Sequence, residues 1–168
     1  MGKSGTPGWP PASIRQRIKN HRELEDMVRT LDAEMPDAVE RALTRYLVVR
    51  SAGLVEAVRD DATDLHCQRV GSPRLYRRVL SGLRSGQGVR PKQLVEYLAT
   101  FDMDWRNELE QFLSEDDSRR SDDLGALVNS RKKIAHGDGD QVTSRNALQW
   151  SQTALEVAKW LVDRFDPN

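Results

Sequence analysis

Apolar residues recur every three or four positions through most of this 168-residue chain, and this spacing constrains the fold more than any other feature. It places apolar side chains on one face of an α-helix. The clearest case runs from about Ala38 to Val70, where the period is kept at Val39, Leu43, Tyr46, Leu47, Leu54, Val55 and Val58. No segment has the two-residue alternation of a β-strand. The sequence therefore predicts an all-α helical bundle, with long antiparallel helices and shorter connecting helices.

Further helices are predicted on both sides of this segment. One begins at a Ser13 cap and runs to about Glu34. Those after Val70 are expected at 73–83, at 92–101, at 105–113, from Asp122 to a stop at Gly137, and from a Thr143 or Ser144 cap to Phe165. Gly53 interrupts the longest helix, and we expect it to allow a close contact with a neighbouring helix.

The chain is long enough for one domain, which we place at residues 13–168 after a flexible lead at residues 1–12. A single cysteine, Cys67, excludes an internal disulfide. No apolar run approaches the roughly 20 residues that span a bilayer, so no membrane association is expected. The lead has no hydrophobic segment behind it, unlike a signal peptide. These features indicate a soluble cytoplasmic protein.

Charge is balanced overall, with 26 basic and 26 acidic residues, but it is segregated along the chain. Between Asp64 and Glu96 there is no acidic residue, and the seven cations are Arg69, Arg74, Arg77, Arg78, Arg84, Arg90 and Lys92. Nine carboxylates lie between Asp102 and Asp123. The basic segment is either a contact surface for RNA phosphates, or it pairs with the acidic segment or faces water. Tyr76 is its one residue suited to stacking on bases.

The segment Arg131-Lys132-Lys133-Ile134-Ala135-His136-Gly137 combines a group that holds phosphate with a group that transfers protons. Asn129, Lys132 and His136 share one polar face of a helix. Arg131 lies about 140° around the helix from His136, so their side chains do not automatically meet. They converge if the helix frays at Gly137, if the Arg131 stem wraps back, or if two copies pack about a two-fold axis. The helix geometry favours the third case, in which two copies of the chain form a shared site. The structural alternative is that the cations complement the helix dipole.

This segment, with Asn129-Ser130 before it and a long amphipathic helix after it, resembles the HEPN domain family. The hallmark of that family is an arginine, four to six residues, and then a histidine, often continued as Ile-Ala-His-Gly. The stretch from Arg41 to Glu56 is similar to the long early helix of the bacterial HEPN ribonucleases that accompany defence and toxin systems. The resemblance covers roughly Asp37 to Phe165 and implies a HEPN-like helical bundle.

The resemblance also implies a function. HEPN ribonucleases are homodimers in which two arginines and two histidines form one cleft. By resemblance, His136 is the acid/base group and Arg131 holds the scissile phosphate of RNA. The products are a 2′,3′-cyclic phosphate and a 5′-hydroxyl, with no metal and no cofactor. Such an endoribonuclease acts in a toxin–antitoxin, anti-phage defence or stress system, with a separately encoded antitoxin or sensor protein as a possible partner. The alternative is an inactive HEPN module that binds RNA or a partner protein.

Supporting residues follow from the same reasoning. Asn129 and Lys132 are candidates for orienting His136 or binding a neighbouring phosphate. Arg74, Arg77 and Arg78 of the basic segment are candidates for RNA contact. The chain departs from the family at Lys132, where a small polar residue is common after the arginine. It departs again at Asp138, where the toxins paired with a nucleotidyltransferase carry a tyrosine, so control by modification of that tyrosine is not expected.

Three further groups are assigned from the residues alone. Glu56 lies within the long apolar helix and either pairs with Arg131 or another cation or reaches solvent; we favour solvent. His21 and His66 have no acidic or cysteine companions at ligand spacing, so no metal site is predicted. The four tryptophans are expected to anchor the core and interfaces; they are Trp9, Trp105, Trp150 and Trp160.

Overall fold

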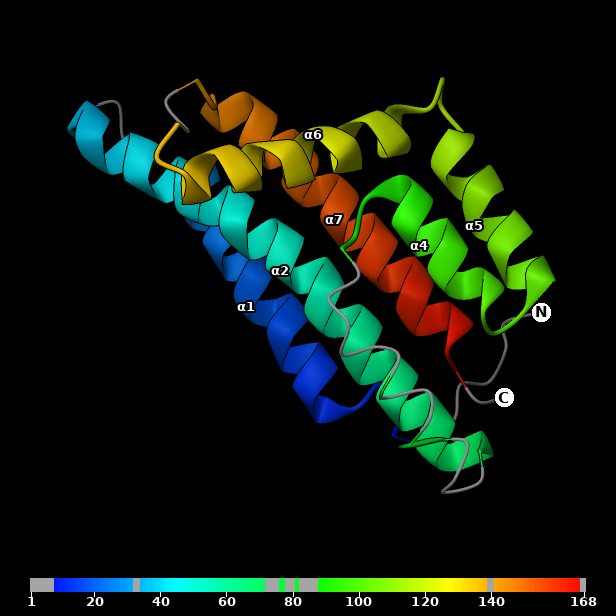
Figure 1. Cartoon of the computed structure of the whole chain (residues 1–168). Helices are drawn as coiled ribbons and strands as arrows, with labels where there is room; N and C mark the ends of the chain where they lie inside the picture. Colours follow the sequence, from blue (N-terminus) through cyan, green and yellow to red (C-terminus); the bar gives the residue numbers. More distant parts are fainter. Residues whose placement is uncertain are drawn as a thin grey trace.

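The computed structural model describes residues 8–31, 34–71, 76–77, 81, 88–138 and 141–166. Regular secondary structure within these ranges is entirely helical, which confirms the predicted fold class. The helices are α1 (Ala12–Arg29), α2 (Asp37–Val70), α4 (Pro91–Ala99), α5 (Met103–Ser114), α6 (Arg119–Ala135) and α7 (Ser144–Arg164) (Figure 1). The helix predicted at 73–83 falls mostly outside the described residues.

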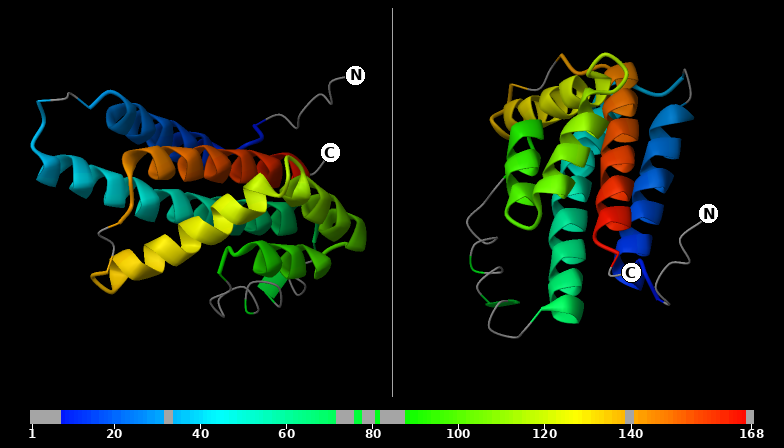
Figure 2. Two further views of the ribbon diagram at one scale, coloured as in Figure 1. Left: turned by 90° about the horizontal axis from the view of Figure 1, so that it is seen from above. Right: turned by 90° about the vertical axis from the view of Figure 1, so that its right-hand side faces the viewer.

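Three long helices, α1, α2 and α7, lie side by side, and α6 crosses over α2 and α7 (Figures 1 and 2). The short helices α4 and α5 pack against each other and against α6. Antiparallel packing holds for α1, which runs opposite to both of its long neighbours. By contrast, α2 and α7 are parallel: Thr44 lies 3.1 Å from Ser144 near one end, and His66 lies 2.9 Å from the Phe165 carbonyl oxygen near the other.

The hydrophobic core follows the line where α2 meets α7. Leu47, Val55 and Val58 of α2 are fully buried there, as are Ala158 and Leu161 of α7. Gly53 does not provide the close helix contact that we expected, because a Cβ at this position would meet no atom within 4 Å. The fully buried alanines of the core lie on α2 and α7, and they are Ala52, Ala62, Ala147, Ala154 and Ala158.

Helix α1 differs from its prediction at both ends. Pro11, and not Ser13, is the N-cap residue, and it makes no side-chain capping bond. Proline has no side-chain oxygen to accept from the first-turn N–H groups, so this helix begins without the usual side-chain cap. The helix ends at Arg29, five residues earlier than expected, and the Thr30 hydroxyl donates to the Asp26 carbonyl oxygen at 2.8 Å.

Helix α7 begins as its cap predicts. Thr143 is the N-cap, and its hydroxyl oxygen accepts from the Asn146 backbone N–H at 3.2 Å. Of the residues expected to form a flexible lead, Trp9 packs onto the far end of this helix, where its indole N–H donates to the Val162 carbonyl oxygen at 2.9 Å. Residues 1–7 lie outside the described part of the chain.

Helix α6 begins three residues before the predicted Asp122, after a left-handed turn at Asp116, Asp117 and Ser118. Their φ angles are 53°, 55° and 63°, values that non-glycine residues rarely adopt. The next residues tie the turn to α7: Arg120 Nε lies 2.7 Å from Glu156 Oε2, and Arg119 Nη2 lies 3.0 Å from it. Burial acts to raise the pKa of Glu156, but the two arginines outweigh burial and lower it.

A buried polar cluster joins the three long helices at mid-length. The Ser151 hydroxyl of α7 donates to Glu25 Oε2 of α1 at 2.9 Å, so its oxygen accepts from His21 Nε2, also 2.9 Å away. Ser51 of α2 lies 3.5 Å from the same nitrogen and donates to the Leu47 carbonyl oxygen. Glu25 also pairs with Arg29. Each polar group in the cluster thus has a partner, which offsets the cost of burial.

His21 should make the stability of the protein depend on pH. Burial first, and then the charge of Arg50, lower the pKa of His21 from 6.5 to about 4. Below pH 6.5 the unfolded chain binds a proton that the folded chain does not, so stability falls as the pH drops towards 4. The loss should reach about 3 kcal/mol. Urea unfolding of the parent and of His21→Gln at pH 7, 5.5 and 4 measures it. An identical pH dependence in both proteins would contradict the assignment.

Candidate functional site

Arg131 lies on the side of α6 that faces α2, and its guanidinium is engaged there. Arg131 Nη1 lies 2.5 Å from Glu56 Oε1. The preference for a solvent-facing Glu56 was therefore wrong, and the alternative of a pair with Arg131 is correct. Both side chains remain about one third exposed, at 37% for Arg131 and 31% for Glu56. An ion pair this accessible contributes at most about 1 kcal/mol, so another anion can compete for the arginine.

His136 is the C-cap residue of α6, and it is exposed. Its backbone N–H donates to the carbonyl oxygens of Lys132 and Lys133, at 3.2 Å and 3.1 Å. Lys132 is exposed one turn earlier, so these two side chains share a face of the helix as the sequence predicts. Within the described residues the imidazole makes no hydrogen bond and does not contact Arg131. The structure thus brings His136 beside Lys132, and it directs Arg131 towards α2.

Asn129 has a different partner from the one expected. Its Oδ1 accepts from Arg90 Nη2 at 2.6 Å, and Arg90 is the N-cap residue of α4. Asn129 is two turns, roughly 10 Å along the axis, from His136 and cannot orient it. The contact between Asn129 and Arg90 instead ties α6 to the start of α4.

The basic segment is only partly visible. Arg77 is exposed, whereas Arg74 and Arg78 lie outside the described residues. The neighbouring Tyr76 hydroxyl donates to Asp64 and accepts from Gln68, both on the last turns of α2. This position is at least roughly 12 Å along α2 from Glu56, so Arg77 and Arg131 belong to different regions of the surface.

The acidic segment forms its ion pairs internally and with α7. Arg106 lies 3.4 Å from Glu110, and Arg164 of α7 pairs with Glu108. In the basic segment, Lys92 lies 3.8 Å from Glu96, and Arg90 binds Asn129; neither partner belongs to the acidic segment. Among the described residues, then, the two segments do not neutralise each other.

Gly137 has a structural role that the sequence motif does not reveal. Its φ is +86°, and its N–H donates to the Ile134 carbonyl oxygen at 3.1 Å. The next N–H, from Asp138, donates to the Lys133 carbonyl oxygen at 2.9 Å. This pair of bonds is a Schellman motif, which ends a helix on a left-handed residue and favours glycine there. The glycine after His136 is thus required by the helix end, whatever the histidine does.

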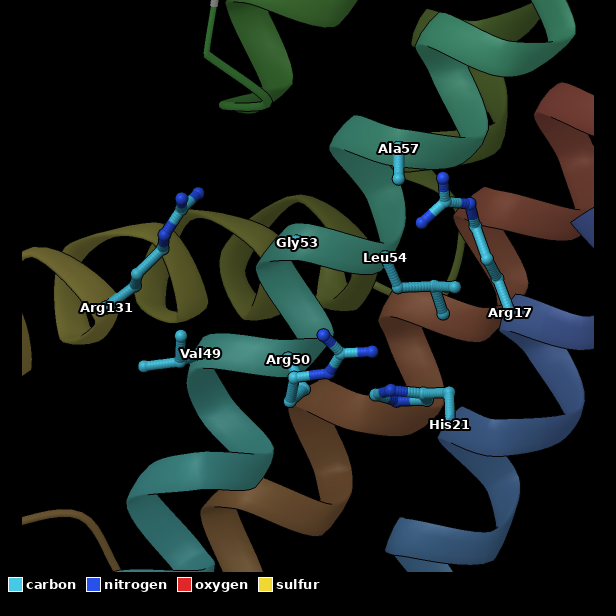
Figure 3. Close-up of a pocket in the computed structure, with 8 residues that line it drawn as sticks. All are labelled: Arg17, His21, Val49, Arg50, Gly53, Leu54, Ala57 and Arg131. Atoms are coloured by element: carbon cyan, nitrogen blue, oxygen red, sulfur yellow. The ribbon is translucent and has the colours of Figure 1, made fainter. Parts of the chain in front are cut away.

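A cavity of about 180 Å³ lies close to Arg131, and sequence reasoning missed it (Figure 3). Arg17 and His21 of α1, Arg50 of α2 and Arg131 of α6 contribute to its wall, with Gly53 between them. The available signals were the four-residue spacing of Arg17 and His21, which puts both on one face of α1, and a glycine three residues after Arg50 on α2. What the sequence does not reveal is that α1 and α2 bring these faces together.

Comparisons with protein-family models, with curated proteins and with solved structures each found no match to this chain. In the described part of the chain, no helix is both long enough and apolar enough to cross a membrane. The described residues also hold no group of three or more His, Cys, Asp or Glu side chains placed to bind a metal ion.

Two glycine substitutions should have opposite effects on stability. Gly137→Ala should lower the free energy of unfolding by about 1 kcal/mol, because alanine is strained at a positive φ. Gly53→Ala should raise it by up to about 1 kcal/mol, because alanine favours a helix interior. A Cβ meets no atom within 4 Å at either position, so backbone conformation alone separates the two. Chemical denaturation of both variants measures the difference. Equal effects would contradict the assigned helix end.

Proposed function

We propose that this chain is a HEPN-type, metal-independent endoribonuclease that acts as a homodimer. The observation that carries the proposal is the exposure of His136 at the end of α6, beside Lys132 and just over one turn from Arg131. An exposed imidazole can reach a substrate, and the neighbouring Lys132 ammonium favours a phosphate there. The motif that led to the resemblance therefore lies on an accessible helix end.

The chemistry follows from the two side chains. His136 removes the proton of a ribose 2′-hydroxyl, whose oxygen attacks the adjacent phosphorus. A bond from phosphorus to the 2′-oxygen forms, the bond to the 5′-oxygen breaks, and a second imidazole gives that oxygen a proton. Arg131 stabilises the added charge on the phosphate. The products are a 2′,3′-cyclic phosphate and a 5′-hydroxyl.

A dimer supports this scheme because one chain supplies one imidazole at this place and does not bring Arg131 to it. Two copies of α6 about a two-fold axis would supply two imidazoles and two guanidinium groups. Exposed apolar side chains of α2 are suited to such a contact: Val39 is 42% exposed and Tyr46 is 51% exposed. Tyr46 precedes Val49 by three residues and so shares its face, and Figure 3 draws Val49 on the side of α2 that faces Arg131.

The alternative is an inactive HEPN module that binds RNA or a partner protein. The engagement of Arg131 with Glu56 favours it, because an RNA phosphate must displace a carboxylate before the arginine can act. Because this ion pair is about one third exposed, the cost of displacement is small. We therefore prefer the enzyme and keep the module as the second candidate. In a cell, either would fit a toxin–antitoxin, anti-phage defence or stress system with a separate antitoxin or sensor.

RNA cleavage in excess chelator tests the enzyme. The purified protein should produce fragments with cyclic-phosphate ends, and Arg131→Ala and His136→Ala should each lower the rate at least about 100-fold. Lys159→Ala, which removes an exposed cation of α7, should leave the rate unchanged. Glu56→Gln removes the carboxylate that binds Arg131, so the cleavage rate of this variant should equal or exceed that of the parent protein. RNA that stays intact but is bound would favour the inactive module.

Mixing two inactive variants tests the shared site. In a mixed dimer of Arg131→Ala and His136→Ala, one chain keeps its histidine and the other keeps its arginine. If Arg131 of one chain acts with His136 of the other, mixing should restore part of the activity, with water giving the 5′-oxygen its proton in place of the missing second imidazole. A site within one chain should stay inactive. Sedimentation should show a dimer for each variant alone. A monomeric parent protein would contradict the proposal.

A further inference from the structure

The cavity between α1 and α2 at Gly53 has a wall dominated by cations (Figure 3). Arg17 enters from α1, Arg50 from α2 and Arg131 from α6, and none of the eight residues that line the cavity is acidic. We propose that this cavity binds a phosphate group, either free phosphate or a phosphodiester of an RNA chain. The inference does not depend on RNA cleavage at His136.

Hydrogen-bond donors remain available around the cavity. Arg17 uses its Nε to bind Asp61 at 3.0 Å, and within the described residues its two terminal nitrogens donate to no acceptor. Arg131 binds Glu56 through Nη1 alone. Arg50 is exposed and makes no hydrogen bond or ion pair in the described part of the chain. Guanidinium groups with unused donors are the groups that proteins use to hold phosphate oxygens.

The charges leave a net positive site. From outside the cavity, Asp61 offsets the charge of Arg17 and Glu56 offsets the charge of Arg131. No carboxylate pairs with Arg50 in the described part of the chain. The field of Arg50 already acts on its neighbour, because it adds to burial in lowering the pKa of His21. An anion beside Arg50 would remove this repulsion, so the site favours negative charge.

Gly53 provides the space. It lies at the centre of the cavity wall in Figure 3, and a Cβ there would meet no atom within 4 Å. The volume of about 180 Å³ is several times the roughly 30 Å³ that one water molecule occupies in the liquid. A tetrahedral oxyanion fits with some of its water. A longer side chain at this position would fill the same space and leave each arginine in place.

His21 forms the inner wall and is held rigidly, since it is only 4% exposed and its Nε2 is bound by Ser151. Its other ring nitrogen makes no hydrogen bond within the described residues. The charged groups around the ring are Arg50 of α2, Arg17 of the same helix, and Glu25, which is bound through Ser151. A bound phosphate should therefore raise the pKa of His21, and by linkage a phosphodiester, whose own charge is constant in this range, should bind more tightly as the pH falls.

The imidazole resonances of the full chain report on binding. The chain has three histidines, and substitutions of His66 and His136 by Gln assign them. Inorganic phosphate, added at constant ionic strength, should shift the His21 signal saturably and raise its pKa. Arg50→Gln should weaken binding about tenfold, as expected for the loss of a charge-assisted contact. Gly53→Leu should abolish binding, whereas the matched Gly53→Ala and the distant Lys159→Gln should retain it.

A short RNA with 2′-O-methyl groups, which cannot form the cyclic product, separates the two sources of phosphate. If it shifts His21 and competes with inorganic phosphate, the site holds the RNA backbone. If it does neither and inorganic phosphate still saturates, the site holds a free phosphate. The proposal is overturned if neither probe shifts His21, or if the shifts persist in both Arg50→Gln and Gly53→Leu. Phosphate binding should survive in His136→Ala, so loss of cleavage and loss of this site are separate results.

Discussion

The parallel contact between α2 and α7 is the constraint on which the rest of the fold depends. Helix α2 is roughly 50 Å long, and α7, roughly 32 Å long, packs against its apolar face from about Thr44 to His66. Because the two helices run in the same direction, the chain must return to its starting end before α7 can begin. The segment that returns includes α4, α5 and α6, and this path carries α6 across α2 (Figure 1). The position of Arg131 is therefore a consequence of the chain's return path.

Much of this architecture could be predicted from the sequence because it depends on local properties. The helical spacing of apolar residues predicted the ends of α2 to within one residue, and the capping side chain of Thr143 specified the start of α7. The start of α6 could not be predicted, since three non-glycine residues adopt a left-handed turn that is supported by contacts with α5 and α7. The parallel direction of α2 and α7 also depends on the whole chain, and no local pattern records it.

In the candidate site, too, local features could be predicted from the sequence, whereas contacts between distant segments could not. The shared face of Lys132 and His136, and the separation of Arg131 from them, followed from helix geometry. The partner of Arg131 did not, because Glu56 is far away in sequence and long side chains choose their partners in space. Gly137 and Arg131 both contribute to the structure, one by ending a helix and the other by joining two helices. A structural role does not exclude a role with RNA, because both side chains of the ion pair remain accessible.

The polar cluster around His21 has a consequence for how uniquely the bundle folds. Apolar faces of helices tolerate sliding, because one aliphatic side chain can replace another in a contact. Moving α1 by one turn, about 5.4 Å, would put one of His21 and Glu25 in the other's place and carry the second out of hydrogen-bond reach of Ser151. Each polar group left without a partner costs on the order of 1–3 kcal/mol. A few hydrogen bonds thus fix the register of three helices whose apolar contacts alone would permit several.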